Sequence, residues 1–519
     1  MNTPNIGGIC NPGSTQWENI LADLHTYPRS PHRGLEIERL RTIAWNDQPL
    51  FLAEYGMGSG THFPRILRHY EAHGEESYHM AKSYEDMLTR FLADWDRWKL
   101  GDTFASPEDF FDKCLAKMAG LRRMGINALR SNPAIISYNV TGTHDTAEAY
   151  SEGVITAFRE HKPGTFDVMC DAFSPLRWCL FTEPVSVYRG GKVKLEAVLS
   201  NEDVLKPGEY PVLLQVLGPH DERIIERTIS VTIPAKAGNV EPPYAIPVFS
   251  EELPVDAPSG QCRFVARLLK GGAATGESVD FYVTDPADMP AVKTEVTLWG
   301  EDQVLADWLS GHGIKTRPFA AGKPTRREVI LVAAQPGGAG DAAAWRELAE
   351  RMAAGSAVVF LSLDVFQKEG NPLGWLPLAN KGSMGIVSEY FFPQVYIRDE
   401  WAKRHPIFQG LPTGLMDYVF YREIIPDCRY SGQDTPDEAV AGAFRTGMTY
   451  NCAELMLTVY KFGAGKFILN SLRVRQALGQ DPTAEYLLRN MLNYAALNID
   501  KPAVALPNDF EEQLKAIGF

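Results

Sequence analysis

The chain lacks long apolar runs, an excess of positive charge and regularly spaced cysteines. None of its 519 residues belongs to a run approaching about 18 consecutive apolar residues, which argues against a membrane-spanning helix. The N-terminus has no basic segment followed by an apolar one, so it does not read as a secretory signal peptide. Lysine and arginine total 51 against 65 aspartate and glutamate residues, and the net charge of -14 argues against nucleic acid as a partner.

The seven cysteines lie far apart, and no Cys-x-x-Cys pair occurs. This pattern indicates neither a zinc ribbon nor a disulfide framework. We expect mostly buried free thiols in a reducing compartment, which favours a cytoplasmic location. The cysteines are Cys10, Cys114, Cys170, Cys179, Cys262, Cys428 and Cys452.

No motif predicts a cofactor or a resident metal. Four histidines crowd one region, and two of them, His69 and His73, would share a helix face at a spacing that could suit zinc. No His-Glu-x-x-His motif accompanies them. Solvated or paired histidines are therefore the expected reading of His62, His69, His73 and His79.

Residues 1–175 alternate short apolar strands with long helices, which predicts a parallel sheet. Strands are expected at 6–9, 21–24, 50–53 and 134–138. Helices are expected at 35–43, 63–72, 83–100 and 108–123, the last with Ser106 as its N-cap. One face of the 83–100 helix should line the core: Tyr84, Met87, Leu88, Phe91, Leu92, Trp95 and Trp98.

Two further parts follow. Residues 176–288 show period-two alternation broken by glycine-rich turns, which predicts an immunoglobulin-like β-sandwich. Residues 289–519 return to alternating strands and helices, which predicts a flavodoxin-like, doubly wound α/β domain. Class I glutamine amidotransferases share that fold but need a nucleophilic cysteine after a strand. No cysteine follows the expected strands here, and Cys428 and Cys452 are expected in irregular or helical segments, so this domain is expected to be a non-catalytic relative.

The segment with the most chemical content is Phe51-Leu-Ala-Glu54-Tyr-Gly-Met-Gly-Ser-Gly60. Phe51, Leu52 and Ala53 read as a buried strand, and the glycines permit a tight turn at its carboxyl end. Chemistry in parallel sheets is found at that end. A carboxylate there, beside an aromatic residue, is typical of a glycosidase nucleophile, although a glutamate in this place can equally cap a helix or pair with an arginine.

Several segments, in order, resemble family 2 glycoside hydrolases, the relatives of β-galactosidase and β-glucuronidase. They are Asp23-Leu-His25-Thr-Tyr27-Pro, Phe51-Leu-Ala-Glu54-Tyr55-Gly56, Ser131-Asn-Pro-Ala-Ile-Ile-Ser-Tyr138-Asn-Val-Thr-Gly142, and the run from Lys162 to Phe181. The resemblance covers roughly residues 1 to 290. It implies that residues 1–175 are the last strands of a (β/α)8 TIM barrel leading into the sandwich.

The resemblance also implies roles for individual residues. Glu54 would be the nucleophile of a retaining β-glycosidase, and Tyr27 would hydrogen-bond to it. Substrate contacts would fall to His25, Tyr55, Tyr138 and Asn139, with no cofactor and no metal. The carbohydrate substrate would be the main partner.

This chain departs from the family in one essential part. The family's general acid/base is the glutamate of an Asn-Glu pair that precedes the nucleophile. No Asn-Glu pair occurs among the 53 residues before Glu54, and Asn201-Glu202 is expected in a sandwich turn. The chain is therefore expected to carry the nucleophile half of the site, completed by an N-terminal glycosidase half or within a homo-oligomer. The alternative is a non-catalytic carbohydrate- or partner-binding module, for which Trp299, Trp345 and Trp375 could supply exposed binding surfaces, although tryptophan is more often a core residue.

Overall fold

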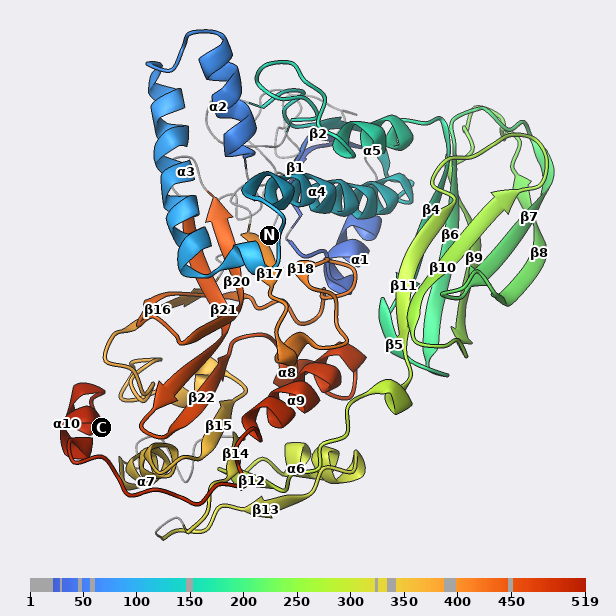
Figure 1. The fold of residues 1–519 in the computed structure, drawn as a ribbon. Coiled ribbons are helices and arrows are strands. Elements are labelled where there is room, and N and C mark those ends of the chain that lie inside the picture. Colours follow the sequence, from blue (N-terminus) through green and yellow to red (C-terminus); the bar gives the residue numbers. More distant parts are fainter. Residues whose placement is uncertain are drawn as a thin grey trace.

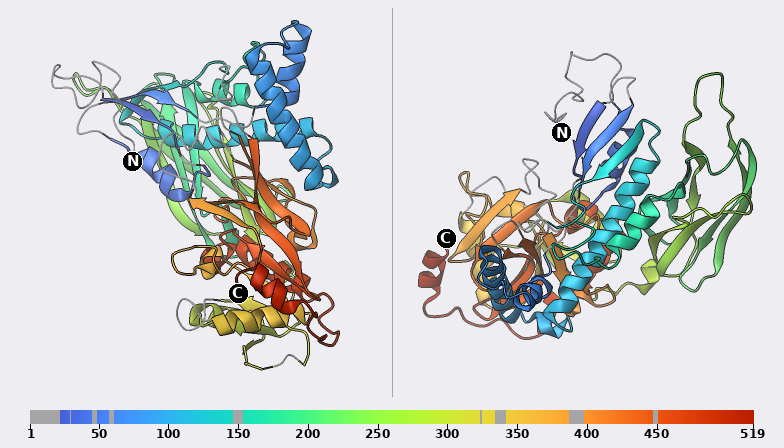
Figure 2. Two further views of the ribbon diagram at one scale, coloured as in Figure 1. Left: turned by 90° about the vertical axis from the view of Figure 1, so that its left-hand side faces the viewer. Right: turned by 90° about the horizontal axis from the view of Figure 1, so that it is seen from above.

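The computed structural model describes residues 22–28, 30–44, 49–56, 61–145, 153–322, 325–333, 342–386, 398–446 and 451–519. These form a mixed α/β protein in three parts (Figure 1). A helical part with a small sheet lies above a larger C-terminal part, and two all-β sheets stand to one side. Seen from above, the two all-β sheets again stand apart from the rest of the molecule (Figure 2, right). The turn predicted after Gly56 falls on residues 57–60, outside the described residues, as do the strand predicted at 6–9 and Cys10.

The small sheet has three parallel strands in the order β1-β2-β3. They are β1 (Ala22–Thr26), β2 (Leu50–Tyr55) and β3 (Ile135–Val140). Helices α1 (Gly34–Thr42), α4 (Pro107–Arg130) and α5 (Thr165–Ala172) pack on one face of the sheet, where Leu52, Ile126 and Met169 share a core. The parallel arrangement predicted for these strands is confirmed, while their membership of a barrel stays a prediction.

Two helices form an arm beside this sheet (Figure 1). Helix α2 (Phe63–Ala72) matches its predicted bounds, and α3 (His79–Arg97) begins four residues before the predicted start. A short 3-10 turn, η1 (Leu100–Asp102), follows. Ser106 caps α4 as predicted, accepting the Asp109 amide hydrogen bond at 3.1 Å, but the helix continues seven residues beyond Arg123.

The aromatic stripe of α3 faces a core, as predicted, with one exception. Phe91 is fully buried and Trp95 nearly so, whereas Leu92 is exposed to 37% and lies outside the stripe. The other half of this core comes from far along the chain. Phe91 and Phe110 pack on Phe444 with ring centroids 4.5 and 5.4 Å apart. Trp401, Ala439 and Leu455 complete the same core.

The two all-β sheets face each other across a single core that includes Trp178, Val212 and Phe281. The first sheet contains β4 (Leu176–Glu183), β6 (Lys192–Asn201) and β9 (Ala245–Pro254), all antiparallel. The second has the order β5-β11-β10-β7-β8. Its strands are β5 (Ser186–Tyr188), β7 (Gly208–Leu217), β8 (Arg223–Ile233), β10 (Gly260–Leu268) and β11 (Ser278–Thr284). Two stacked sheets were predicted here, and their immunoglobulin-like classification stays a prediction.

The C-terminal part is built on a nine-stranded sheet that begins with five parallel strands in the order β13-β12-β14-β15-β22. These are β12 (Val296–Trp299), β13 (Thr316–Pro318), β14 (Val329–Val332), β15 (Ala357–Phe360) and β22 (Gly465–Asn470). The order suits a doubly wound sheet. Its helices are α6 (Gln303–Gly311), α7 (Ala342–Ala353), α8 (Val474–Ala477), α9 (Pro482–Ala495) and α10 (Phe510–Ala516).

Four antiparallel strands extend this sheet, and the sequence did not predict them. They are β17 (Arg398–Ala402), β18 (Gly414–Leu415), β20 (Glu438–Thr446) and β21 (Asn451–Phe462). A separate pair joins β16 (Lys381–Ile386) to β19 (Cys428–Gln433). Short 3-10 turns stand at η2 (Pro286–Asp288), η3 (Leu363–Phe366) and η4 (Pro406–Phe408). The irregular or helical setting expected for Cys428 and Cys452 was wrong, since both lie on strands. The flavodoxin-like classification stays a prediction.

A buried ion cluster ties α4 to this sheet. The Lys117 ammonium group lies 3.0 Å from Asp399 Oδ1 and 3.1 Å from Glu400 Oε2, and it donates to the Arg398 carbonyl oxygen at 2.7 Å. All three charged side chains are at most 5% exposed. Burial opposes protonation of Lys117, but Asp399 and Glu400 outweigh it and raise its pKa well above the usual value.

Candidate active site

A β-bulge orients Glu54. Leu24 of β1 pairs with Leu52, but the next residue, His25, pairs with Glu54, so Ala53 is an extra residue in β2. Leu50 and Leu52 point into the core, and strict alternation would send Glu54 after them. The inserted residue instead turns Tyr55 inward and leaves Glu54 partly exposed, with 37% of its side chain accessible. Bulges re-aim side chains in this way at functional edges of sheets.

Two groups from β1 and its carboxyl end hold the Glu54 carboxylate. The Tyr27 hydroxyl donates to Glu54 Oε2 at 2.5 Å, and His25 Nδ1 lies 2.8 Å from the same oxygen. Thr141, just past β3, approaches the Tyr27 hydroxyl at 3.3 Å. Among the described residues, both contacts to the carboxylate fall on Oε2, so one oxygen is anchored and Oε1 is left for other chemistry.

Asn139 and Thr141 fasten the bulge from the other side. The Asn139 side-chain amide donates to the Ala53 carbonyl oxygen at 3.2 Å, and the Thr141 amide donates to the Tyr55 carbonyl oxygen at 2.9 Å. The β2–β3 register is irregular between Leu52 and Tyr55, so the usual ladder bonds are interrupted there. The two bonds from β3 and its end satisfy backbone groups that the bulge would leave unpaired.

The structure gathers some of the predicted site residues and not others. His25, Tyr27 and Asn139 lie around Glu54 and its bulge. Tyr55 lies in the core, only 1% exposed, where burial raises the pKa of its hydroxyl. The Tyr138 hydroxyl donates to the Ala172 carbonyl oxygen at 3.1 Å, and its ring stacks on Phe173. The substrate contacts expected of Tyr55 and Tyr138 are thus not favoured by where these side chains lie.

A buried pair that sequence reasoning missed follows β3. The Lys162 ammonium group lies 2.5 Å from Asp145 Oδ1, and the Gly153 amide donates to the same oxygen at 3.0 Å. Burial lowers the pKa of Lys162 to about 8 against the pull of Asp145, and burial also raises the pKa of Asp145. Perturbed groups of this kind gather at functional sites. No local motif marks Asp145, because its partner is 17 residues away in the chain.

The histidines of the arm take part in pairs. His69 Nε2 lies 2.7 Å from Glu160 Oε2, and its ring stacks on Phe158. His62 accepts the Arg65 amide hydrogen bond at 3.1 Å as the N-cap of α2, and burial lowers the pKa of its ring. His73 also stacks on Phe158. Pairing, the reading expected from the sequence, is confirmed for His62 and His69.

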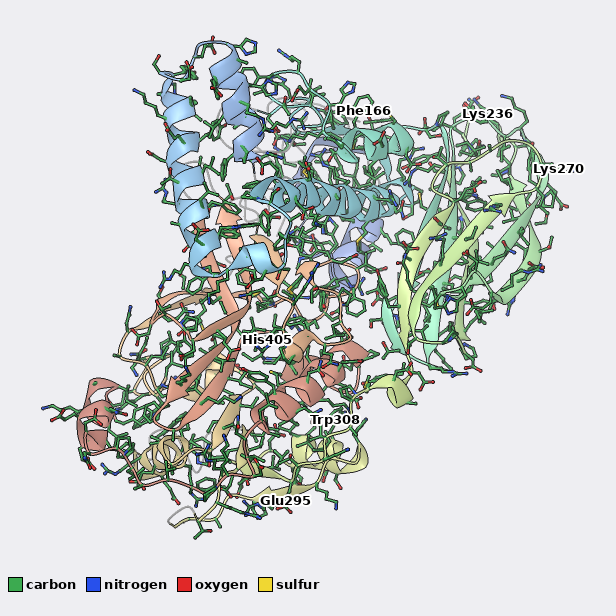
Figure 3. The ribbon with its side chains drawn as sticks, in the orientation of Figure 1. Phe166, Lys236, Lys270, Glu295, Trp308 and His405 are labelled. Atoms are coloured by element: carbon green, nitrogen blue, oxygen red, sulfur yellow. The ribbon has the colours of Figure 1, made fainter. Side chains whose placement is uncertain are left out.

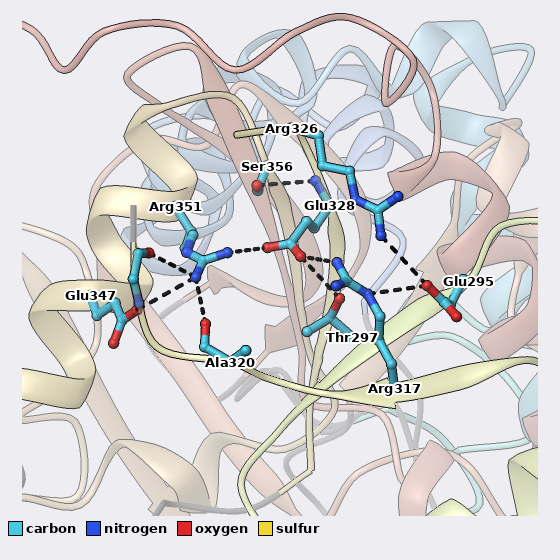
Figure 4. Close-up of polar contacts among 10 residues, drawn as sticks. Glu295, Thr297, Arg317, Ala320, Arg326, Glu328, Glu347, Arg351 and Ser356 are labelled. Carbon is cyan, nitrogen blue, oxygen red and sulfur yellow. Dashed lines mark hydrogen bonds and ion pairs between the residues drawn. The ribbon is translucent and has the colours of Figure 1, made fainter. Parts of the chain in front are cut away.

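A second charged cluster lies in the C-terminal part, at the amino end of the parallel strands of the nine-stranded sheet (Figure 4). Glu328, directly before β14, pairs with Arg317 and, at 2.6 Å, with Arg351. Arg351 also donates to the Ala320 and Gly322 carbonyl oxygens. Because this is the amino end of the parallel strands and the buried carboxylate has two cationic partners, the cluster closes the sheet edge rather than offering a reactive group.

The tryptophans named for a binding module are core residues. Trp299, Trp345 and Trp375 are each at most 2% exposed, and Trp345 packs against both of the others. The suggestion that they form carbohydrate-binding surfaces was wrong. Trp308 of α6 is half-buried, packs against the edge of the core and stacks on His312 (Figure 3).

Comparisons with known proteins add little to this geometry. No protein-family model and no curated protein matches the sequence. A glycosyl hydrolase family 2 member from Bacteroides cellulosilyticus aligns over 36% of this chain and 25% of its own, with 14% identity and a TM-score of 0.17. A β-glucuronidase from Parabacteroides merdae aligns over 40% and 27%, with 10% identity and a TM-score of 0.16. An alkylpurine DNA glycosylase from Pseudomonas fluorescens aligns over 42% and 52%, with 11% identity and a TM-score of 0.15.

Family 2 glycosyl hydrolases thus stand among the structural neighbours, at low identity and over part of each chain. The chain spans about a quarter of the length of these hydrolases. With TM-scores this low, the alignments do not establish a shared fold, and the geometry around Glu54 carries the interpretation. In the part of the chain that the structure describes, no helix has the length and apolarity needed to span a bilayer.

Proposed function

We propose that this chain provides the nucleophile of a retaining β-glycoside hydrolase and that Glu54 is that nucleophile. The observation that carries the proposal is the anchored carboxylate at the carboxyl end of a parallel strand. Glu54 is turned outward by a bulge and held through Oε2 by Tyr27 and His25. Such preorganisation suits a group that must attack one carbon atom in a fixed direction.

In this proposal Oε1 of Glu54 attacks the anomeric carbon of a β-glycoside, and the bond to the leaving oxygen breaks. The result is a glycosyl ester on Glu54, which water then hydrolyses with overall retention of configuration. The Tyr27 hydroxyl and His25 keep Oε2 in place while charge leaves the carboxylate. Asn139 contributes indirectly, because it fastens the bulge that sets the direction of Glu54.

A retaining enzyme needs a second carboxyl group about 5 to 5.5 Å from the first. The Asn-Glu pair that supplies it in the family does not precede Glu54 in this sequence. The single Asn-Glu pair, Asn201-Glu202, lies at the end of β6 in the all-β part, where Glu202 pairs with Arg130 of α4 at 2.7 Å. We propose that an N-terminal glycosidase half brings the acid/base to this site.

Labelling with 2-deoxy-2-fluoroglycosyl fluorides tests Glu54 without that partner. Fluoride is a good leaving group and needs no general acid, so glycosylation requires only a competent nucleophile. Intact mass spectrometry should show one added 2-fluoroglycosyl group, and peptide mapping should place it on Glu54. A panel of gluco, galacto, manno and glucuronic acid reagents covers the unknown sugar.

Two variants make the result specific. Glu54→Gln should abolish labelling, and Tyr27→Phe should slow it by roughly tenfold or more, since one anchoring hydrogen bond to a charged group is lost. Glu202→Gln is the matched control, because it removes the exposed glutamate of the single Asn-Glu pair and should label like the parent. Labelling of a residue other than Glu54, or none with any reagent, would refute the proposal.

A further inference from the structure

A cavity of about 700 Å³ lies at the junction of the three parts, away from Glu54. One wall is a stripe of α4 that includes Ala116, Gly120 and Met124. Helix α1, strands β4, β6 and β11 and the segment after β18 supply the other walls, with Ile37, Phe181 and Met416 among them. Small-molecule sites have volumes of this size and favour domain junctions.

Gly120 shows that the helix wall is kept open. A glycine inside a helix destabilises it by roughly 0.5–1 kcal/mol relative to alanine, so an interior glycine usually has a packing reason. Gly125, one turn further on, has such a reason, since an added Cβ would lie 1.8 Å from the Tyr55 hydroxyl oxygen. A Cβ on Gly120 would meet nothing within 4 Å. Close packing therefore does not account for Gly120, and the missing side chain enlarges the cavity.

The charges on the wall are balanced except at one residue. Each lining carboxylate has a partner: Glu38 and Glu196 pair with Arg41, Glu183 with Arg422, Asp280 with Arg263, and Asp417 accepts the Val419 amide. Four lining cations are likewise engaged, namely Arg41, Lys117, Lys194 and Arg422. Lys113 pairs with Asp109 on its own helix. Arg123 is exposed, and within the described residues no partner contacts its guanidinium group.

We infer that this cavity binds a small organic anion with an apolar ring or chain. The apolar body would lie over Gly120 and Met124, beside the Phe181 ring that Arg41 covers, and a carboxylate, sulfonate or phosphate would meet Arg123. An unpaired guanidinium beside apolar walls favours such a ligand over a neutral or cationic one. The site is separate from Glu54, and its occupancy does not depend on the proposed glycosidase activity.

Two fluorescent probes of nearly the same shape separate the apolar and anionic contributions. 1-Anilinonaphthalene-8-sulfonate carries a sulfonate, and N-phenyl-1-naphthylamine is its neutral counterpart. Both should bind saturably to the native chain at one site. Gly120→Phe should weaken both by about tenfold or more, because the ring occupies the cavity. Gly311→Phe is the matched control, a helical glycine in α6 whose Cβ also meets nothing within 4 Å, and it should leave both unchanged.

Arg123→Gln tests the anionic part and is a surface change that should not affect folding. It should weaken the sulfonate probe about three- to tenfold and leave the neutral probe within about twofold. Near-ultraviolet circular dichroism confirms that each variant is native. If the probes bind saturably but Gly120→Phe leaves their affinity unchanged, they bind elsewhere and the proposed site is wrong. Equal effects of Arg123→Gln on both probes, or tighter binding of the neutral one by the parent, would overturn the anionic class.

Discussion

Replacing Lys117 with methionine removes a cation that contacts both Asp399 and Glu400, while nearly keeping the length of the side chain. Two ion pairs near 3 Å are lost, each with a Coulomb attraction of roughly 5 kcal/mol at an effective dielectric constant of about 20. Desolvation of the lysine offsets much of this. Two carboxylates then stay buried without it, and removal of one partner from a buried pair typically costs about 3–5 kcal/mol. We expect a loss of that size in the free energy of unfolding.

Urea unfolding followed by tryptophan fluorescence measures this loss, because Trp95, Trp98 and Trp401 lie in the neighbouring core. Lys113→Met is the matched control on the same helix. Its ammonium group is 46% exposed and pairs with the partly exposed Asp109 of the same helix, so we expect a loss of about 0.3–0.5 kcal/mol. Adding Glu400→Gln to Lys117→Met should restore part of the stability, since it removes one stranded charge. A Lys117→Met variant within about 1 kcal/mol of the control would refute the view that this cluster joins the parts.

Three further predictions concern other sites. Asp481 caps α9, and burial raises the pKa of its carboxyl group to about 6. Its contribution to the free energy of unfolding is therefore fully present below the unfolded pKa of 3.8 and is lost as the pH rises through 6. In thermal melts, Asp481→Asn should stabilise the chain by up to about 3 kcal/mol at pH 8 and not at pH 4. The hydrogen bond from His405 lowers the pKa of Glu438 to about 2, although burial opposes this shift. Because the Glu438 side chain is 41% exposed and partly screened, Glu438→Gln should reduce the free energy of unfolding by about 1 kcal/mol. This loss should shrink as the pH falls from 4.5 toward 2. Gly125→Ala should cost about 1–3 kcal/mol through its clash with Tyr55, whereas Gly120→Ala should gain about 0.5–1 kcal/mol, as urea midpoints would show.

The sequence predicted the elements whose patterns are local. The parallel strands, the arm helices and the two stacked sheets follow from apolar periodicity and caps, and Ser106 is an example where the cap residue alone was sufficient. The contact between Glu54 and Tyr27 was expected only from the resemblance to family 2 glycoside hydrolases, and the structure shows the hydrogen bond between their side chains. The bulge at Ala53 was not predictable, because it is a property of the register between strands and leaves no mark on either strand alone.

The missed strands show the other limit. Strand β17 reads Arg-Asp-Glu-Trp-Ala, which resembles a solvated segment, yet every residue is buried. Its charged side chains can be buried because residues distant in the sequence pair with them. Lys117 pairs with Asp399 and Glu400, and Glu454 pairs with Arg398. Strand β20 is buried on both faces over most of its length, so it lacks period-two alternation. In both cases the deciding partner lies far away in the chain.

The core shared by Phe91 and Phe444 has a consequence for synthesis. The helical arm leaves the ribosome with an aromatic stripe whose covering strands are still about 350 residues from being made. At roughly 5–20 residues per second, that interval lasts about 20–70 s. During it, Phe91, Trp95 and Phe110 stay open to water and to other nascent chains. The yield of folded protein should therefore depend on chaperones that bind exposed aromatic surface. Slower elongation should lower that yield, because it lengthens the exposure.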